Sequence, residues 1–349
     1  MVEVNSEMNR LYYQGMKSVP DLDCDFTKLE GKSVLITGAT GVIGSAFIDL
    51  LMSLKICRLQ VYAAGRNAVR AEKLFFKYKN NSCFHFLKFD VTKQFSFDEK
   101  FDFIIDSAGA SSPLLYSQKP VEVMESNILG VKNLLDYGKE HGLKKFVYVS
   151  SGEIYGEGDG RIFTEDYSGY VNPLNYRSCY PIAKRASETL CVSYAREYGI
   201  NVSIARPCHV YGPNFSEEDN RVYAQFIRNV LNGENIVLKS KAEQFRSWIY
   251  SDDCADALLC ILLRGENCEA YNIANFNSNL SIKEFAEIIA SQSGRKIVFD
   301  IPDDGFGGVT TPVTKAVFST EKLEALGWKA QIGIEDGIRK TIEEMRGKE

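Results

Sequence analysis

The stretch Thr37–Gly44, TGATGVIG, places three glycines in a GxxGxxG spacing directly after the apolar run KSVLIT at 32–37. The residues that follow, GVIGSAFIDLLMSL at 41–54, have the apolar spacing of a helix. Glycines permit a tight turn and a close approach of the backbone to a pyrophosphate, and a helix N-terminus offers free N–H groups. The stretch predicts a strand, a dinucleotide-binding turn and a helix. A glycine turn needed only for packing is the alternative.

Strand-like and helix-like segments alternate along the first 210 residues. The strand-like segments lie at 32–37, 59–66, 84–92, 101–109, 144–151 and 201–207. The helix-like segments lie at 41–54, 68–79, 120–142 and 180–199. This alternation predicts an α/β fold, a Rossmann-type doubly wound parallel sheet covered by helices on both faces.

The alternation weakens after about residue 210, where helices are predicted at 221–234 and 281–294 among short strands. We expect three regions: a lead-in at 1–30 with one short helix, an NAD(P)-binding Rossmann domain at 31–210, and a part at 211–349. The last part is expected to be mainly a smaller α/β substrate-binding cap, with some segments returning to the Rossmann sheet.

The composition bounds the class of protein. The chain has 349 residues, a net charge of −5 and no basic block, so neither nucleic acid nor an anionic membrane is an expected partner. No apolar run approaches the roughly 20 residues that span a bilayer, and the start lacks a secretory pattern. Nine scattered cysteines without a CxxC pair predict free thiols in a reducing cytoplasm. The three histidines are far apart, so no metal site is expected.

The end of the second strand is expected to read the adenosine ribose. An acidic residue there would favour NAD, but the sequence has Arg66 and Asn67 instead. Arg66 could pair with a 2′-phosphate, which favours NADP, or it could be a solvated arginine. Asp90, followed by Val91, suits the adenine edge after the third strand, with a simple turn residue as the alternative. The choice between NAD and NADP stays open.

The segment YPIAK places Tyr180 and Lys184 four residues apart, on one face of a predicted helix. A free tyrosine has a pKa near 10, which makes it a poor base at neutral pH. We expect the Lys184 ammonium and a cationic nicotinamide to lower that pKa and to poise the phenol for proton transfer. The hydroxyl of Ser151 lies 29 positions before Tyr180. A surface Tyr–Lys pair on an amphipathic helix is the alternative.

With TGATGVIG, SSGEIYG at 150–156 and YPIAK in this order, the chain resembles the extended short-chain dehydrogenase/reductase family, or NAD-dependent epimerases and dehydratases. Within that family, residues from about 31 to 345 are most similar to UDP-glucuronate decarboxylases. The similarity is most specific in EDYSGYVNPLNYRSCYPIAKR at 165–185. SAGASSPLLYSQKP at 107–120, NRVYAQFI and FRSWIYSDD continue it.

The resemblance implies a nucleotide-sugar enzyme with a retained nicotinamide cofactor. C4 of the sugar is oxidised while Tyr180 removes the hydroxyl proton, Ser151 bonds the same oxygen, and Lys184 holds the ribose. Glu153 is then expected to act near C5, and Arg246 to contact phosphate or carboxylate. A turn carboxylate and a surface ion pair are the respective alternatives for these two residues.

The reaction near C5 depends on the residue before Glu153. TDP-glucose dehydratases carry an Asp–Glu pair, but this chain has Gly152 at the Asp position. A lone Glu153 fits decarboxylation or a single-Glu 4,6-dehydration, and a 4-epimerase needs neither acid. We expect a UDP-glucuronate decarboxylase-like lyase, with the epimerase and the dehydratase as alternatives. An NADPH-consuming reductase and a non-catalytic NAD(P)-binding protein are alternatives of other classes.

Several positions depart from the pattern of the decarboxylases. His209 stands where they carry an Asn, and it is either a substitute ligand or a packed histidine. Lys239 stands where an aromatic residue is expected, and Lys315 where an arginine would grip the pyrophosphate. The segment FDIPDDGFGGVTT at 299–311 lacks the usual basic residues. These departures leave the base and the sugar open.

The expected site residues fall into three groups. The catalytic group is Ser151, Glu153, Tyr180 and Lys184. Cofactor contacts are expected at Gly38, Thr40, Gly41, Val42, Ile43, Gly44, Arg66, Asn67, Asp90, Val91, Ala108, Gly109, Tyr180, Lys184 and Pro207. Substrate contacts are expected at Ser111, Ser112, Tyr116, Glu153, His209, Arg221, Arg246 and Lys315. The resemblance also implies a homodimer through the helices at 120–141 and 180–198.

Overall fold

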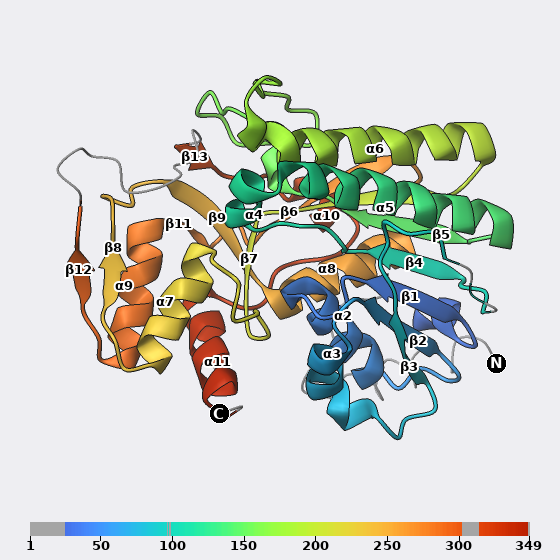
Figure 1. The fold of residues 1–349 in the computed structure, drawn as a ribbon, viewed down its shortest axis with the longest axis horizontal. Helices are drawn as coiled ribbons and strands as arrows, with labels where there is room; N and C mark the ends of the chain where they lie inside the picture. The colour runs from blue at the N-terminus through green and yellow to red at the C-terminus, as the bar shows by residue number, and fades with distance from the viewer. Residues whose placement is uncertain (1–24, 96, 98, 302–313, 348–349) are drawn as a thin grey trace.

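The structure is a computed structural model that describes residues 25–95, 97, 99–301 and 314–347 (Figure 1). Of the expected lead-in, only the part from Asp25 onward is described, and it contains the 3-10 turn η1 (Phe26–Leu29). Most of the unusual segment at 299–311 also lies outside the described residues.

The largest sheet is seven-stranded and wholly parallel, with the strand order β10-β6-β5-β4-β1-β2-β3. Its strands are β1 (Ser33–Thr37), β2 (Gln60–Gly65), β3 (Phe84–Lys88), β4 (Phe103–Asp106), β5 (Lys145–Val149), β6 (Val202–Pro207) and β10 (Glu269–Ile273). The strand order reverses between β1 and β4. In such sheets ligands bind outside the carboxyl ends of the strands at this switch point.

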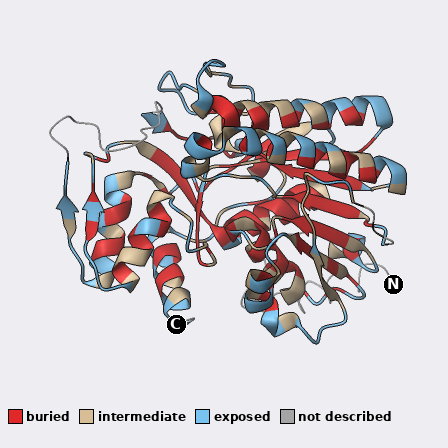
Figure 2. Cartoon of the chain, in the orientation of Figure 1, coloured by how far each residue is buried: buried red, intermediate tan, exposed pale blue. Residues whose placement is uncertain are grey.

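Helices cover both faces of the sheet (Figure 1). They are α2 (Val42–Ser53), α3 (Ala68–Phe75), α5 (Pro120–His141), α6 (Cys179–Tyr198) and α8 (Ser251–Arg264), and the short α4 (Pro113–Gln118) packs against α5. Successive residues of β1 point to opposite faces: Val34 and Ile36 belong to the core cluster that contains α2 and α8, whereas Leu35 belongs to the cluster with α5 and α6. The inner strands are therefore apolar on both sides, and Figure 2 shows that they are buried, whereas the edge strand β3 is only partly buried.

The smaller cap consists of short strands and amphipathic helices. Its strands are β7 (His209–Tyr211), β8 (Ile236–Leu238), β9 (Phe245–Tyr250), β11 (Asn279–Ser281), β12 (Ile297–Phe299) and β13 (Lys315–Ala316). Its helices are α7 (Val222–Leu231), α9 (Ile282–Ser293) and α11 (Ile334–Arg346), whereas the short α10 (Glu321–Glu324) packs against β10 of the large sheet. The 3-10 turns η2 (Phe76–Tyr78), η3 (Gly152–Tyr155) and η4 (Tyr176–Ser178) lie in the first part of the chain. The predicted α/β class with a smaller cap is confirmed.

Elements from the second half of the chain return to the large sheet. Helix α8 packs against α2 across one face, and β10 pairs in parallel with β6 as the edge strand. The buried Lys145 ties α8 to the sheet, because its Nζ donates to the carbonyls of Ile261 (2.8 Å) and Gly265 (2.6 Å). A division at residue 210 remains our proposal for the domain boundary, with this exchange across it.

Two further findings concern the class of the chain. In the described ranges, no helix is both long and apolar enough to cross a membrane. Eight of the nine cysteines lie in those ranges, and all eight are free thiols.

Candidate functional site

The glycine turn joins β1 to α2 at the switch point of the sheet. Gly38 has a left-handed φ of 62°, and a Cβ there would lie 2.5 Å from the carbonyl oxygen of Ser107. The helix starts so close to the turn that a Cβ on Gly44 would lie 2.5 Å from the carbonyl oxygen of Gly38. Gly41 caps α2 with no side-chain hydrogen bond. The N–H groups of Val42 and Ile43 at the helix start can therefore meet a pyrophosphate, and the turn fits a dinucleotide.

The residues expected at the ribose and adenine lie at the ends of β2 and β3. Arg66 and Asn67 are exposed, and the Asn67 side chain caps α3 by accepting from Arg70 N–H (3.0 Å). Asp90 accepts from both the N–H and the hydroxyl of Thr92, each at 2.9 Å. Burial alone would raise the pKa of Asp90, but these hydrogen bonds and the charge of Arg66 lower it overall. Arg66 and Asp90 therefore face one region.

The glycine turn is also connected to the cap. Arg70 donates from Nε to the Thr40 carbonyl (3.1 Å) and from Nη2 to the Asn214 carbonyl (2.5 Å). The Asn214 amide in turn donates to Ser45 Oγ on α2 (3.2 Å). This bridge was not predicted, because nothing local to residue 214 indicates a partner 144 positions away.

The loop after β4 supplies further expected contacts. The Ala108 N–H donates to Thr37 Oγ1 (3.2 Å), and a Cβ on Gly109 would lie 2.6 Å from Asn127 Oδ1. Ser111 is exposed, whereas Ser112 donates to Asn220 Oδ1 of the cap (2.7 Å). On the sheet side, Val91 packs against Gly130 of α5 and Pro207 is buried at the end of β6.

The proposed catalytic residues lie together at the carboxyl ends of β5 and β6. Tyr180 and Lys184 are both buried on α6, and Lys184 Nζ donates to the Val149 carbonyl (2.8 Å). Ser151 Oγ accepts from the Glu153 N–H (3.1 Å) and also interacts with the Tyr180 hydroxyl. One helix face and one strand end thus bring a hydroxyl, a phenol and an ammonium together.

The predicted lowering of the Tyr180 pKa by Lys184 is wrong for this structure. Burial, with a smaller contribution from the charge of Glu153, raises the pKa of Tyr180 to about 12, against lowering effects of Ser151, Arg221 and Arg177. Burial also lowers the pKa of Lys184 to about 8. The Lys184 ammonium is directed to the Val149 carbonyl and lies 5.8 Å from the centre of the Tyr180 ring, so it does not contact the phenol oxygen through a hydrogen bond in the described structure.

Two contacts of the catalytic residues were not predicted: the stacking of Tyr116 on Tyr180, and the ion pair between Arg177 and Glu153. The Tyr116 ring stacks on the Tyr180 ring, with centroids 4.8 Å apart and planes at 17°. Arg177 lies over the Tyr116 ring, with its guanidinium carbon 4.5 Å from the ring centre. The Nη2 atom of Arg177 is 3.0 Å from Glu153 Oε2. Arg177 stands in the family-like block at 165–185, but its pairing with Glu153 has no local sequence signal.

The remaining expected substrate contacts come from the cap. Arg246 on β9 is buried, which lowers its pKa to about 10, and the charge of Glu153 acts against this shift. Arg221 lies within electrostatic reach of Tyr180 but pairs with Asp219 (Nη2–Oδ2 2.5 Å). Lys315 is exposed on β13, the neighbour of β9. Arg246 is thus near the catalytic group, whereas Lys315 is at the periphery.

His209 is expected to act as a neutral hydrogen-bonding group. His209 is exposed at the start of β7, and its ring centre lies 5.3 Å from that of Trp248. Desolvation by the surrounding protein, followed by the charges of Arg246 and Arg221, lowers the pKa of His209 to about 3. Replacing His209 with Asn should leave the shape of the pH–rate profile unchanged around neutral pH, because the imidazole carries no charge there. Steady-state kinetics over that range test this, and a displaced acid limb would contradict it.

The space beside Gly152 is filled by an aromatic side chain. A Cβ on Gly152 would overlap with the Phe318 ring. Phe318 is 1% exposed and packs against Tyr155 (centroids 5.5 Å apart) and Phe163 (5.7 Å). The absence of an aspartate at position 152 therefore has a packing reason.

We predict that Gly152→Asp destabilises the protein by about 1–3 kcal/mol, the usual cost of overpacking a filled core. The cost should be smaller when the same substitution is made together with Phe318→Leu, which removes the overlapping ring atoms. Denaturant unfolding of the four proteins in this double-mutant cycle gives the coupling free energy. An equal cost in both backgrounds would mean that Phe318 does not exclude the side chain.

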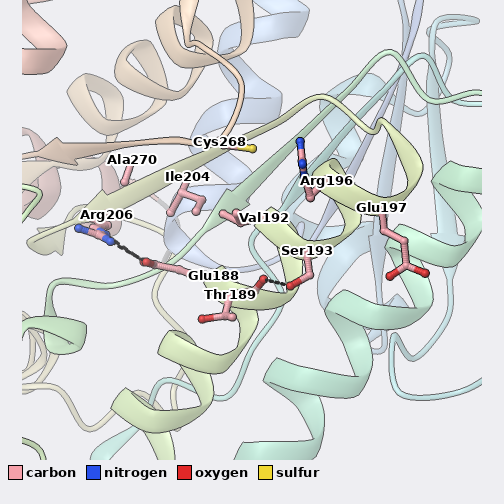
Figure 3. A pocket seen from close by; sticks show the side chains of 10 residues that line it. All are labelled: Glu188, Thr189, Val192, Ser193, Arg196, Glu197, Ile204, Arg206, Cys268 and Ala270. Atoms are coloured by element: carbon pink, nitrogen blue, oxygen red, sulfur yellow. Dashed lines mark hydrogen bonds and ion pairs between the residues drawn. The ribbon is translucent and has the colours of Figure 1, made fainter.

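A separate hollow of about 600 Å³ lies beside α6 and contains none of the predicted site residues (Figure 3). It is lined by α6, β6 and β10, and its polar wall holds the buried ion pair of Arg206 and Glu188 (2.7 Å). Elsewhere in the described ranges, no cluster of three or more His, Cys, Asp or Glu is placed to hold a metal ion.

The sequence is similar to a known family and to named enzymes. Residues 34–274 match the model of the NAD dependent epimerase/dehydratase family. UDP-glucuronic acid decarboxylase 6 of Arabidopsis thaliana is 31% identical over 317 residues, which is 90% of this chain and 88% of the relative. UDP-glucuronic acid decarboxylase 1 of Xenopus tropicalis is 29% identical and covers 90% of this chain and 72% of the relative.

Solved structures share the fold. The UDP-N-acetylglucosamine 4-epimerase of Methanobrevibacter ruminantium has a TM-score of 0.79 at 22% identity, covering 92% of this chain and all (100%) of the other. The UDP-glucuronic acid 4-epimerase of Bacillus cereus, solved with UDP-glucuronic acid and NAD, has a TM-score of 0.76 at 22% identity, covering 90% and 99%. With its glycine turn and matching family model, the chain belongs to the NAD-dependent epimerase/dehydratase family.

Proposed function

We propose that this chain is a nucleotide-sugar decarboxylase that acts on UDP-glucuronate and retains its nicotinamide cofactor. The observation that carries the proposal is the gathering of Ser151, Tyr180 and a single acid, Glu153, at the end of β5, with Phe318 closing the position of a second acid. The relatives named UDP-glucuronic acid decarboxylase support the choice of substrate.

The residues present fit a dinucleotide held by the glycine turn, the end of β2, Asp90 and Lys184. When bound, the dinucleotide supplies the acceptor and donor of hydride for C4 of the sugar. Tyr180 takes the proton of the C4 hydroxyl, and Ser151 bonds the same oxygen. Because the phenol has a raised pKa, its conversion to tyrosinate depends on positive charge that arrives with the bound cofactor.

The C4 ketone makes loss of the neighbouring carboxylate possible. The C5–C6 bond breaks, CO2 leaves, and the electron pair moves onto the C4 oxygen as an enolate. A proton is then added at C5, and Glu153 is the group we assign to that side of the ring. Restoration of the C4 alcohol, with the proton from Tyr180, completes a cycle without net oxidation.

Incubation with UDP-glucuronate, UDP-glucose, GDP-mannose, CDP-glucose and TDP-glucose tests the proposal, with products analysed by mass spectrometry. We expect UDP-glucuronate to lose CO2. Loss of water from a neutral sugar would instead identify a dehydratase, the second candidate that a lone Glu153 favours. Steady consumption of NADPH would identify a reductase. The nucleotide released by denaturing the purified protein decides between NAD and NADP.

We further propose a cytoplasmic homodimer. Helices α5 and α6 pack side by side over the sheet, and they leave apolar side chains on their outer faces, including Leu129 (42% exposed) and Val192 (38%). Two copies of this helix pair would cover these residues. Sedimentation analysis should give about twice the chain mass of 39.2 kDa, and a monomer at micromolar concentration would contradict the assembly.

A further inference from the structure

Arg177 lies between the acid of the site and the aromatic stack. It belongs to the turn η4, where its N–H donates to the Asn175 side chain (2.9 Å), and it precedes Tyr180 by three residues. Its Nη2 contacts both oxygens of Glu153, at 3.1 and 3.0 Å. Its guanidinium carbon lies 4.5 Å from the centre of the Tyr116 ring. Turn, ion pair and ring together fix the guanidinium in one place.

One donor of this guanidinium is left over. Only 17% of the Arg177 side chain is exposed. Its Nε atom is buried and has no hydrogen-bond partner in the part of the chain that the structure describes. Leaving a buried donor without an acceptor costs about 1–3 kcal/mol, and more when the group is charged. A fixed, charged and unsatisfied donor beside a catalytic acid indicates a ligand with an anionic oxygen.

The position of Arg177 indicates which part of a sugar would supply that oxygen. Tyr116 stacks on Tyr180, the residue assigned to C4, and Glu153 is assigned to C5. A group held by Arg177 is therefore next to both positions, where the C6 substituent lies. We propose that Arg177 binds the C6 carboxylate of the nucleotide sugar and so selects uronates over neutral hexoses; this rests on the proposed function.

The ion pair explains how two anions can share the site. The substrate carboxylate would approach Glu153, and two carboxylates close together repel each other. Arginine presents five N–H donors in a planar fork, so it can contact Glu153 through one edge and the substrate through another. Arg177 thereby offsets the repulsion and orients the C5–C6 bond.

Binding measurements in a Tyr180→Phe background test the assignment, because the substrate is not consumed there. Calorimetric titrations use UDP-glucuronate, UDP-glucose and UDP. Adding Arg177→Gln should weaken UDP-glucuronate binding by about 10-fold to 100-fold, with UDP-glucose and UDP changed less than about threefold. Arg177→Lys should restore part of the loss. Arg161→Gln, the same change at an exposed ion pair, should have no effect on any ligand.

A Glu153→Gln substitution in that background separates carboxylate binding from positioning of the acid. It removes the repelling charge and the ion pair, while the amide oxygen can still accept a hydrogen bond from Arg177, so UDP-glucuronate should bind as tightly as before or more tightly. Equally weakened binding of all three ligands in Arg177→Gln would mean that Arg177 binds the phosphates. Unchanged binding of UDP-glucuronate in Arg177→Gln would also overturn the assignment. So would a loss of UDP-glucuronate binding in Glu153→Gln that equals the loss in Arg177→Gln. If the Tyr180→Phe parent binds UDP but not UDP-glucuronate, the proposed substrate fails together with it.

Discussion

Replacing Tyr180 with Phe is expected to lower turnover by about 10²-fold to 10⁴-fold, the usual contribution of a positioned acid–base group. The change removes one oxygen and keeps the ring that stacks on Tyr116, so the packing of the site should survive. Binding of the nucleotide sugar should therefore change little, and Kd and kcat separate the two effects.

Tyr176→Phe is the matched control, since Tyr176 is exposed and only four residues away on the same segment. It should keep the parental kcat. Full activity of Tyr180→Phe would refute the proposed proton path. Loss of both turnover and binding would mean that the hydroxyl is needed for binding rather than for chemistry.

Replacing Glu153 with Gln is expected to slow formation of the UDP-pentose by about 10²-fold or more, because the amide cannot donate the proton that C5 accepts after CO2 has left. Oxidation at C4 does not require Glu153 in our account, so reduced nicotinamide should accumulate during a single turnover. Rapid-mixing absorbance follows oxidation at C4, and the amount of UDP-pentose in quenched samples follows protonation at C5. The partner Arg177 loses its ion pair in this variant, but the amide oxygen can still accept its hydrogen bond.

Glu157→Gln makes the same chemical change on the same loop at an exposed position and should behave like the parent. A near-parental rate for Glu153→Gln would contradict the assignment of the acid to C5. Equal slowing of C4 oxidation and UDP-pentose formation would show that the residue acts before C5 chemistry begins.

Local sequence patterns predicted the part of the site that depends on neighbours in the chain. The spacing of Gly38, Gly41 and Gly44 indicated a strand, turn and helix, and the i, i+4 spacing of Tyr180 and Lys184 placed both on one helix face. Alternation of strands and helices predicted the parallel sheet. The sequence predicted that some later segment would return to the sheet, but not that β10 would be its edge strand.

Contacts across long stretches of sequence could not be predicted in the same way. Phe318 fills the space beside Gly152 from 166 positions away, and Tyr116 stacks on Tyr180 across 64 positions. Such pairs depend on tertiary packing, for which a single sequence has no periodic signal. The same limit explains the wrong prediction for the Tyr180 pKa. A charge four residues away was visible in the sequence, whereas the burial that raises the pKa to about 12 was not.

Isotope tracing shows whether the hydride removed from C4 returns to the same carbon. UDP-glucuronate that carries deuterium on C4 is incubated in ordinary water, and the product is analysed by NMR and mass spectrometry. We expect a UDP-pentose that keeps the deuterium at C4, since the hydride removed from that carbon is returned to it. The same reaction with unlabelled substrate in D2O should place one deuterium at C5. A pentose product without the C4 label, or unchanged UDP-glucuronate, would refute decarboxylation with a retained cofactor.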